Sequence, residues 1–179
     1  MPRRQPSAST AATGAEMLLL DRQICFALYS TSLAMTKVYQ PLLGAVGLTY
    51  PQYLVMLILW ETDRVTVSAI GERLFLDSGT LTPLLKRLQA AGLVTRERDT
   101  VDERRVLIGL TDAGRVLQRQ AETIPPCILE STGCSVPELA ELVGRLDHLR
   151  RRLMAPGDTD STPPTNPAST EAAITKEAP

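Results

Sequence analysis

Residues 76–114, near the middle of the chain, read LDSGTLTPLLKRLQAAGLVTRERDTVDERRVLIGLTDAG. Asp77 or Ser78 can cap the start of a helix here, and Gly92 provides its C-terminal stop. A shorter helix fits residues 67–75 just before, and two short helices joined by a tight turn form a helix-turn-helix. After Gly92 come an apolar strand start, a charged tip and a Val/Leu/Ile return, which predict a β-hairpin, or wing. The segment therefore predicts a winged helix-turn-helix.

Two further helices are predicted on the N-terminal side of this unit. Apolar residues recur at roughly helical spacing over residues 16–43 and predict a long first helix, which Pro41 and Gly44 interrupt. Thr49 and Gln52 form a capping box for a second helix that is apolar on all sides. A helix of that kind is buried, so we expect it in the core.

The C-terminal side predicts two more helices. Thr111 caps a fifth helix that reaches toward Ile124, where Pro125 and Pro126 disturb it. A second capping box at residues 135–138 starts the last helix. Its apolar residues share one face: Leu139, Leu142, Val143, Leu146, Leu149 and Leu153. Because a unit of this size cannot cover so much apolar surface, we expect the N- and C-terminal helices to form a dimerisation region. The fold class expected is mainly α, with a small β-hairpin wing.

Composition sets the limits of the folded part. The chain has 179 residues, 44% of them apolar, with a formal charge of −1, as in ordinary globular proteins. Residues 155–179 are mostly Pro, Thr, Ser, Ala and acid and cannot bury a core, so they predict a disordered tail. We expect a second disordered tail at residues 1–15 and one domain at residues 16–154.

Several functional classes are disfavoured by the residue inventory. The longest apolar run, residues 53–60, is far shorter than the roughly 20 residues of a membrane helix. We therefore expect a cytoplasmic protein that does not span a membrane. Three cysteines make an odd number, which argues against a secreted disulfide framework. With His148 as the single histidine and no CxxC, neither a metal site nor a cofactor is expected.

The second helix of a helix-turn-helix enters the major groove, where hydroxyl and basic side chains reach base edges and phosphates. The candidates for this role are Ser78, Thr80, Thr82, Lys86 and Arg87. Residues 86–105 hold six basic and four acidic side chains, which is a weak signal alone, and each candidate in isolation could be part of a solvated face. Their order, followed by an Arg-tipped loop, favours a major-groove element beside a minor-groove element on a two-fold dimer.

Residues 76–114 resemble the recognition helix and wing of MarR-type transcription regulators. The wing signature of that family is Asp, one residue, Arg and a later Leu-Thr, which appears here as Asp102, Arg104, Leu110 and Thr111. The resemblance implies that Arg104 inserts into the minor groove and that Asp102 helps to hold the wing. Arg105 in the same loop joins the DNA-binding candidates. The resemblance covers about residues 17–153.

Cys25 lies on the apolar first helix, where a cysteine is commonly an inert core residue. A sensing thiol instead needs donors or positive charge directed at its sulfur. Tyr29 is one helical turn away on the same face, and Tyr39, Tyr50 and Tyr53 complete the four tyrosines of the chain. Phenols can donate to a thiolate. Packing at a subunit interface stays the alternative, most of all for Tyr53.

Residues 20–61 resemble the start of the organic-hydroperoxide resistance branch of the MarR family. The resemblance implies that Cys25 is the peroxide-reactive residue and that Tyr39 and Tyr50 of the partner subunit hydrogen-bond to it, with Tyr29 nearby. The thiolate would attack the peroxide and become a sulfenic acid, which condenses with another thiol or is oxidised further.

A second cysteine would make this oxidation reversible. The family keeps its resolving cysteine in the C-terminal part of the other subunit, where this chain offers Cys127 and Cys134. If the segment between them were helical, the two would lie roughly 10 Å apart, beyond disulfide reach. We favour Cys127 slightly, because Pro125 and Pro126 indicate flexible backbone beside it. Cys134, which follows Gly133, stays open as the alternative.

Together these observations predict a homodimeric repressor on a pseudo-palindromic double-stranded DNA operator, released when organic hydroperoxides oxidise Cys25. One alternative is a MarR-type repressor that binds a small phenolic ligand non-covalently, with Cys25 structural. A thiol peroxidase is a more distant alternative, because no catalytic base lies near Cys25 in sequence and the single His148 is near the far end. We therefore expect a protein that is not an enzyme.

Overall fold

The computed structural model describes residues 18–100, 102 and 104–155. The chain divides into two compact units, which meet in sequence between Cys134 and Ser135. The expected tail at residues 1–15 and residues 156–179 of the other tail lie outside the described residues. Their disorder therefore stays a prediction.

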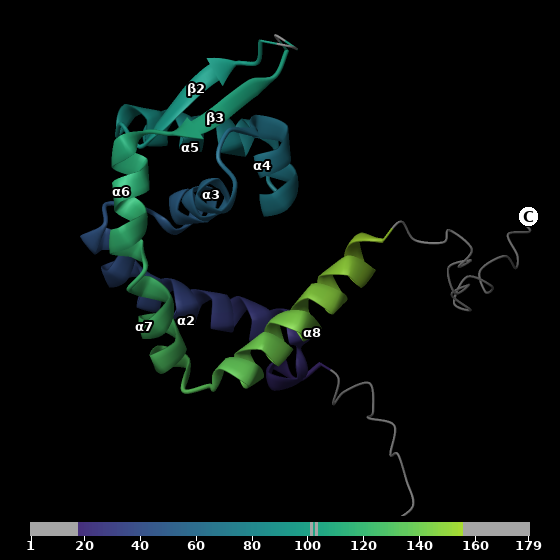
Figure 1. Ribbon diagram of the computed structural model, residues 1–179. Coiled ribbons are helices and arrows are strands. Elements are labelled where there is room, and N and C mark those ends of the chain that lie inside the picture. The colour runs from purple at the N-terminus through teal and green to yellow at the C-terminus, as the bar shows by residue number, and fades with distance from the viewer. Residues whose placement is uncertain (1–17, 101, 103, 156–179) are drawn as a thin grey trace, which may run out of the picture. The chain divides into compact units, whose positions relative to one another are not determined.

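The first unit is mainly helical with one small sheet, as the sequence predicted (Figure 1). In chain order its elements are η1 (Leu20–Arg22), α2 (Ile24–Ala45), α3 (Tyr50–Glu61), β1 (Val65–Thr66), α4 (Val67–Leu74), α5 (Ser78–Ala90), β2 (Val94–Arg98), β3 (Val106–Leu110), α6 (Asp112–Ala121) and α7 (Ile124–Thr132). The described part of the second unit is one long helix, α8 (Val136–Met154), with one flanking residue at each end.

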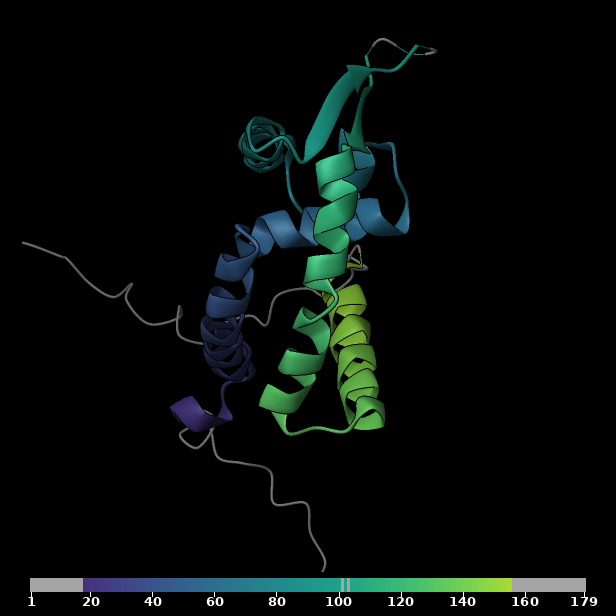
Figure 2. The ribbon, with the colours of Figure 1, turned by 60° about the vertical axis from the view of Figure 1, so that its left-hand side comes forward.

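The predicted hairpin is confirmed, and a third strand joins it. The strand order is β1-β3-β2 and all pairs are antiparallel, with Val65 opposite Ile108 at one edge. The β2–β3 hairpin projects beyond the helices of the first unit in both views (Figures 1 and 2). The sequence did not predict β1, because two residues are too few to show the alternation of a strand.

The core lies beneath the helix-turn-helix. Helix α3 contacts α4, α5, α6 and β3, so its apolar residues are covered from several sides, as predicted. Met56 and Ile108 are 0% exposed, as are Leu81 and Leu85 of α5. The recognition helix and the wing are therefore attached to one shared core.

Cap hydrogen bonds confirm the predicted helix starts. Asp77, and not Ser78, caps α5, because its Oδ1 accepts a hydrogen bond of 2.8 Å from the Thr80 N–H. Thr111 caps α6, and both predicted capping boxes are present, at the starts of α3 and α8. These starts were predictable because each cap lies within three residues of its partner.

The prolines end fewer helices than predicted. Pro41 lies inside α2, which continues to Ala45. A proline inside a helix removes one hydrogen bond, but α2 packs against both α3 and α7, and these contacts stabilise the helix through Pro41.

The prediction for Pro125 and Pro126 is also wrong. Helix α6 ends at Ala121, and the two prolines lie in the first turn of a separate helix, α7. That position suits proline, because the first N–H groups of a helix have no intrahelical partner. Cys127 is therefore inside a helix, and its expected flexible backbone is not found.

No single helix among the described residues is long and apolar enough to cross a membrane. Helices α2 and α3 pass that test by length and composition only as a pair, which is bent by 69°. Much of α3 is core of the first unit.

Candidate functional site

Helix α5 turns its leucines inward and its polar residues outward. Ser78, Thr80, Lys86 and Arg87 are exposed, and Thr82 is half-buried. The Thr80 hydroxyl donates to Asp77 Oδ2 at 3.0 Å, and the Thr82 hydroxyl donates to the Ser78 carbonyl at 2.6 Å. Of the five predicted residues, Ser78, Lys86 and Arg87 thus keep their donors available to a ligand.

The described part of the wing loop is organised by Asp102. Its Oδ1 accepts from the Arg104 N–H at 3.1 Å, and its carbonyl accepts from the Arg105 N–H at 2.8 Å. Its Oδ2 lies 3.4 Å from Arg105 Nε. Asp102 therefore fixes the backbone of this turn, while the side chain of Arg104 stays exposed at the tip.

The cations of this unit fall into two groups. Three arginines away from the hairpin tip are ion-paired: Arg64 with Glu97 at 3.1 Å, Arg73 with Glu61 at 2.6 Å and Arg115 with Asp63 at 2.6 Å. Eight other cations have no ion pair within the described ranges: Arg22, Lys37, Lys86, Arg87, Arg96, Arg98, Arg104 and Arg119. Five of these eight, Lys86, Arg87, Arg96, Arg98 and Arg104, lie on α5 or the wing, so most of the unpaired positive charge of this unit is there although the chain is nearly neutral.

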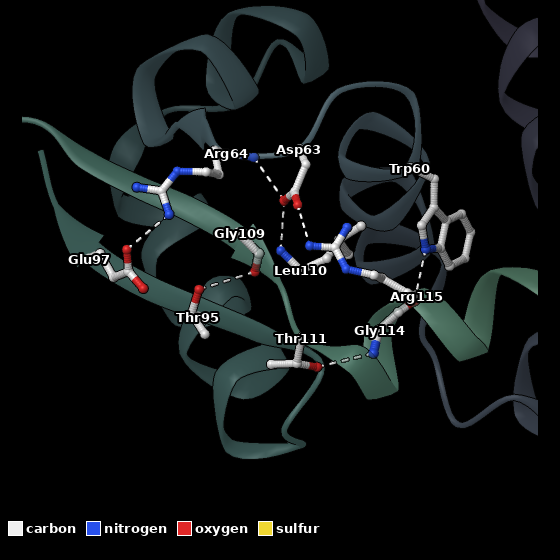
Figure 3. A network of polar contacts seen from close by, with 10 residues as sticks. All are labelled: Trp60, Asp63, Arg64, Thr95, Glu97, Gly109, Leu110, Thr111, Gly114 and Arg115. Carbon is white, nitrogen blue, oxygen red and sulfur yellow. Dashed lines mark hydrogen bonds and ion pairs between the residues drawn. The ribbon is translucent and has the colours of Figure 1, made fainter.

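Asp63 joins the wing to α6 (Figure 3). Its Oδ1 accepts from the backbone N–H groups of Leu110 and Arg64, both at 2.8 Å, and its Oδ2 accepts from Arg115 Nη2 at 2.6 Å. Partial burial acts to raise the pKa of Asp63, but these hydrogen bonds outweigh burial and hold the pKa below its ordinary value. The sequence analysis missed Asp63, because its partners lie 47 and 52 residues further along the chain.

The Leu-Thr end of the wing signature fixes the base of the hairpin. The Thr111 hydroxyl donates to the Gly92 carbonyl at 2.6 Å and accepts from the Gly114 N–H at 3.0 Å. Trp60 Nε1 donates to the Gly114 carbonyl at 3.0 Å (Figure 3). A Cβ on Gly114 would lie 2.2 Å from the Leu93 carbonyl oxygen, so only glycine fits between these elements. Wing, α3 and α6 therefore form one rigid junction.

Cys25 lies in the first turn of α2 and is exposed. Within the described part of the chain no hydrogen bond reaches its thiol. Tyr29, one turn further, is 62% exposed, and Ile24 beside the cysteine is 59% exposed. In the single chain Cys25 is therefore not a core residue, and the thiol lies in an open apolar surface.

Two of the predicted tyrosines come together. The rings of Tyr39 and Tyr50 are 4.8 Å apart, and those of Tyr39 and Tyr53 are 6.1 Å apart. Burial, followed by the neighbouring Tyr50 and Tyr53, raises the pKa of Tyr39 to about 12, so its phenol stays protonated. Tyr53 is 3% exposed and belongs to the core of the single chain, and not to a subunit interface as the packing alternative had it.

Both candidate resolving cysteines are free and half-buried. Cys127 is in α7, where its carbonyl accepts from the Ser131 hydroxyl at 2.7 Å. Cys134 follows Gly133, which ends α7 in a left-handed conformation, and its Sγ lies 3.6 Å from the Thr132 carbonyl. Most of the segment between the cysteines is thus helical.

A pocket of about 260 Å³ lies between α3 and the α6–α7 segment. Tyr53, Leu57 and Trp60 form its α3 side, and Gln118 and Glu122 are among the residues on its other side. The lining is mostly apolar, with carboxylates at the margin.

A helix-turn-helix, a hairpin wing and uncompensated cations over both define a winged helix-turn-helix regulator of transcription. The sequence model of the family described as "Transcriptional regulator SarA/Rot" matches residues 37–120. The organic hydroperoxide resistance transcriptional regulator of Bacillus subtilis (strain 168) is 50% identical over 127 residues, which cover 71% of this chain and 86% of that protein. The chain belongs to this family of MarR-type regulators.

AbfR of Staphylococcus epidermidis is a solved structural relative. Reduced AbfR bound to DNA is 39% identical, with a TM-score of 0.61 over 76% of this chain and 96% of that one. Overoxidised AbfR bound to DNA is also 39% identical, with a TM-score of 0.62 over 78% and 97%. The disulfide form is 40% identical, with a TM-score of 0.54 over 78% and 92%.

Proposed function

We propose that this chain is a homodimeric transcriptional repressor. It binds a pseudo-palindromic DNA operator while Cys25 is reduced, and it leaves the operator when an organic hydroperoxide oxidises Cys25. The observation that carries the proposal is an exposed, apolar-flanked thiol on the same chain as a complete winged helix-turn-helix. The name of the Bacillus subtilis relative supports organic hydroperoxides as the signal.

The homodimer is supported by apolar surface that one chain leaves open. Helix α8 exposes Leu142, Val143, Leu146 and Leu153, and the start of α2 exposes Ile24, Leu28 and Leu33. Exposed apolar surface of this extent is typical of an interaction site. A second copy would cover it, and two-fold symmetry would present two recognition helices to major grooves one turn apart, roughly 34 Å.

In the proposed chemistry the Cys25 thiolate attacks the terminal oxygen of ROOH. The O–O bond breaks, Cys25 becomes a sulfenic acid, and the alkoxide takes a proton and leaves as an alcohol. The thiol of Cys127 or Cys134 of the other subunit then attacks the Cys25 sulfur, which releases water and forms a disulfide. Tyr39, which keeps its proton because its pKa is raised to about 12, and Tyr50 supply phenol donors across the interface.

We assign release from DNA to the disulfide rather than to oxidation of Cys25 alone. AbfR has been solved on DNA in both the reduced and the overoxidised state, so overoxidation is compatible with DNA binding in that relative. A disulfide moves Cys25 toward another subunit and thereby changes the relation between the two recognition helices. Reduction would restore binding.

The test is binding of purified, reduced protein to the DNA that flanks its own gene, followed by gel shift. We expect binding that cumene hydroperoxide abolishes and dithiothreitol restores, and binding by Cys25→Ser that survives the oxidant. If hydroperoxide leaves DNA binding by the wild type unchanged, the proposal is contradicted. An equal response to hydrogen peroxide would contradict the preference for organic hydroperoxides.

A second candidate function is favoured by the pocket beside Tyr53 and Trp60. Its size and aromatic lining suit a small phenolic ligand that would bind without covalent chemistry. Under that reading Cys25→Ser would still release DNA when the inducer is added, whereas the thiol switch predicts no response to hydroperoxide in that variant.

A further inference from the structure

Strand β2 divides its side chains between two faces of the sheet. Residues directly opposite each other in antiparallel strands share a face. One set of opposite pairs is Val94 with Leu110, Arg96 with Ile108 and Arg98 with Val106. Ile108 and Val94 are buried in the core, so Arg96 lies on the face that packs against the helices. Glu97 lies on the other face, where it pairs with Arg64.

Arg96 is unusual in its hydrogen bonding. Its Nε is buried and has no hydrogen-bond partner, and it is the one such side-chain nitrogen or oxygen in the described ranges. A guanidinium keeps its charge at all relevant pH values, and a buried donor without an acceptor is destabilising. Arg96 as a whole is only half-buried, so an acceptor from outside the chain can reach its guanidinium.

The surroundings of Arg96 indicate which acceptor. Strand β2 packs against α5, the helix that carries the exposed Lys86 and Arg87. Arg98 lies on the same face of β2, two residues nearer the hairpin tip. None of these four cations has an ion pair among the residues described. An anion beside this face would therefore meet several positive charges that no ion pair among the described residues neutralises.

We propose that Arg96 is a DNA-contacting residue that donates hydrogen bonds to one backbone phosphate beside the wing. The fork of guanidinium N–H groups fits a phosphate, and such a contact positions the duplex without reading its sequence. This inference rests on the proposed DNA binding. It adds Arg96 of strand β2 to the DNA-contacting residues proposed on the recognition helix and at the tip of the wing loop.

The salt dependence of binding measures such a contact. Each phosphate that a protein neutralises releases condensed counterions, so the slope of log K against log salt is about −0.9 per contact. Loss of one contact should weaken binding by a similar factor on every duplex, whereas loss of a base contact weakens the specific site most.

The experiment uses the reduced full chain and fluorescence anisotropy from about 50 to 200 mM salt, the range over which phosphate contacts are resolved. The probes are a duplex from the DNA flanking its own gene and a scrambled duplex of equal length. For Arg96→Met, which keeps the apolar stem, we expect a slope shallower by about 0.9 and a loss of roughly tenfold in affinity on both duplexes. Arg96→Lys keeps the charge and should keep the slope.

The matched control is Arg64→Met, on the opposite face of the sheet and paired with Glu97. It should leave the slope unchanged. A wild-type slope in Arg96→Met, or an equal change in the control, would overturn the role of Arg96 while leaving DNA binding in place. If the wild type binds neither duplex, the proposed function itself fails, and this inference with it. Circular dichroism melting of each variant separates loss of contact from loss of fold.

Discussion

The winged part of the first unit, α3 to α6, and the helices α2 and α8 carry similar apolar residues, but they bury them to different degrees. Ile70 and Ile108 are 0% exposed, whereas Ile24 at the start of α2 is 59% exposed. Val143 of α8 and Leu153 near its end are more than half exposed as well. The winged part thus buries its core within one chain, whereas the surface around Cys25 and along α8 stays open, and in the proposed dimer a partner covers it. One chain can present a recognition helix, but the proposed sensor needs two.

The largest effect is expected at Gly114, where the wing meets α3 and α6. Gly114→Ala places a Cβ 2.2 Å from the Leu93 carbonyl oxygen, and backbone on both sides must shift. We expect a loss of about 3 kcal/mol in the free energy of unfolding, measured by urea denaturation at fixed protein concentration. The control is Gly144→Ala in α8, where a Cβ meets nothing within 4 Å. It should stabilise the helix by about 0.5–1 kcal/mol. Equal effects at the two glycines would contradict the tight junction.

The next prediction compares two valines of equal exposure. Val143 in α8 is 59% exposed and Val116 in α6 is 57% exposed. If α8 forms the dimer, Val143→Glu buries a charge in the interface and should weaken dimerisation by about 100-fold, close to 3 kcal/mol. Val116→Glu should leave the dimer intact. Analytical ultracentrifugation measures both, and an unchanged dimer in Val143→Glu would remove α8 from the interface.

Asp63 tests the polar junction between wing and α6. Asp63→Asn removes the charge that pairs with Arg115 and weakens the bond to the Leu110 N–H, so we expect a loss of about 1–2 kcal/mol at neutral pH. Because the folded pKa of Asp63 is lowered, its stabilisation is complete above the ordinary pKa of 3.8 and is lost as pH falls through the folded pKa. The difference between wild type and variant should therefore shrink toward acid pH. A difference that is constant across this range would contradict the role of the carboxylate charge.

The smallest effect is expected at the tyrosines. Tyr39→Phe and Tyr50→Phe each remove one phenol donor from the proposed thiol site and should slow oxidation of Cys25 about fivefold, near 1 kcal/mol. Tyr53→Phe is the control, because Tyr53 is buried in the core. Stopped-flow oxidation by cumene hydroperoxide measures the rates. Equal rates in all three variants would assign the tyrosines to packing alone.

The parts of the fold that were predictable from sequence depend on local signals. The cap at Asp77, the capping boxes and the wing are each encoded within a few residues, and all are confirmed. The junction was not predictable, because Asp63 and Trp60 reach partners 47 to 54 residues away. Helix α7 was missed because two prolines were interpreted as the disturbance of one helix rather than the start of another.

The candidate site divides in the same way. The resemblance of residues 20–61 and 76–114 named the thiol, the tyrosines and the loop arginines, because they belong to sequence motifs. Arg96 was counted among the basic residues, but its buried and unpartnered Nε follows from strand register and packing. A sequence pattern shows neither the burial of an atom nor the absence of its hydrogen-bond partner.

Mixed dimers test most directly whether Cys25 of one chain forms a disulfide with a C-terminal cysteine of the other chain. Cys25→Ser is co-expressed with the double variant Cys127→Ser, Cys134→Ser, and the dimers are treated with cumene hydroperoxide and run on a non-reducing gel. Neither parent can join Cys25 to a C-terminal cysteine, but the mixed dimer holds one of each on opposite chains. We predict a dithiothreitol-sensitive covalent dimer in the mixture and in neither parent. A mixture that stays monomeric on the gel, while the wild type forms the covalent dimer, would contradict the completion of the Cys25 site by the other subunit.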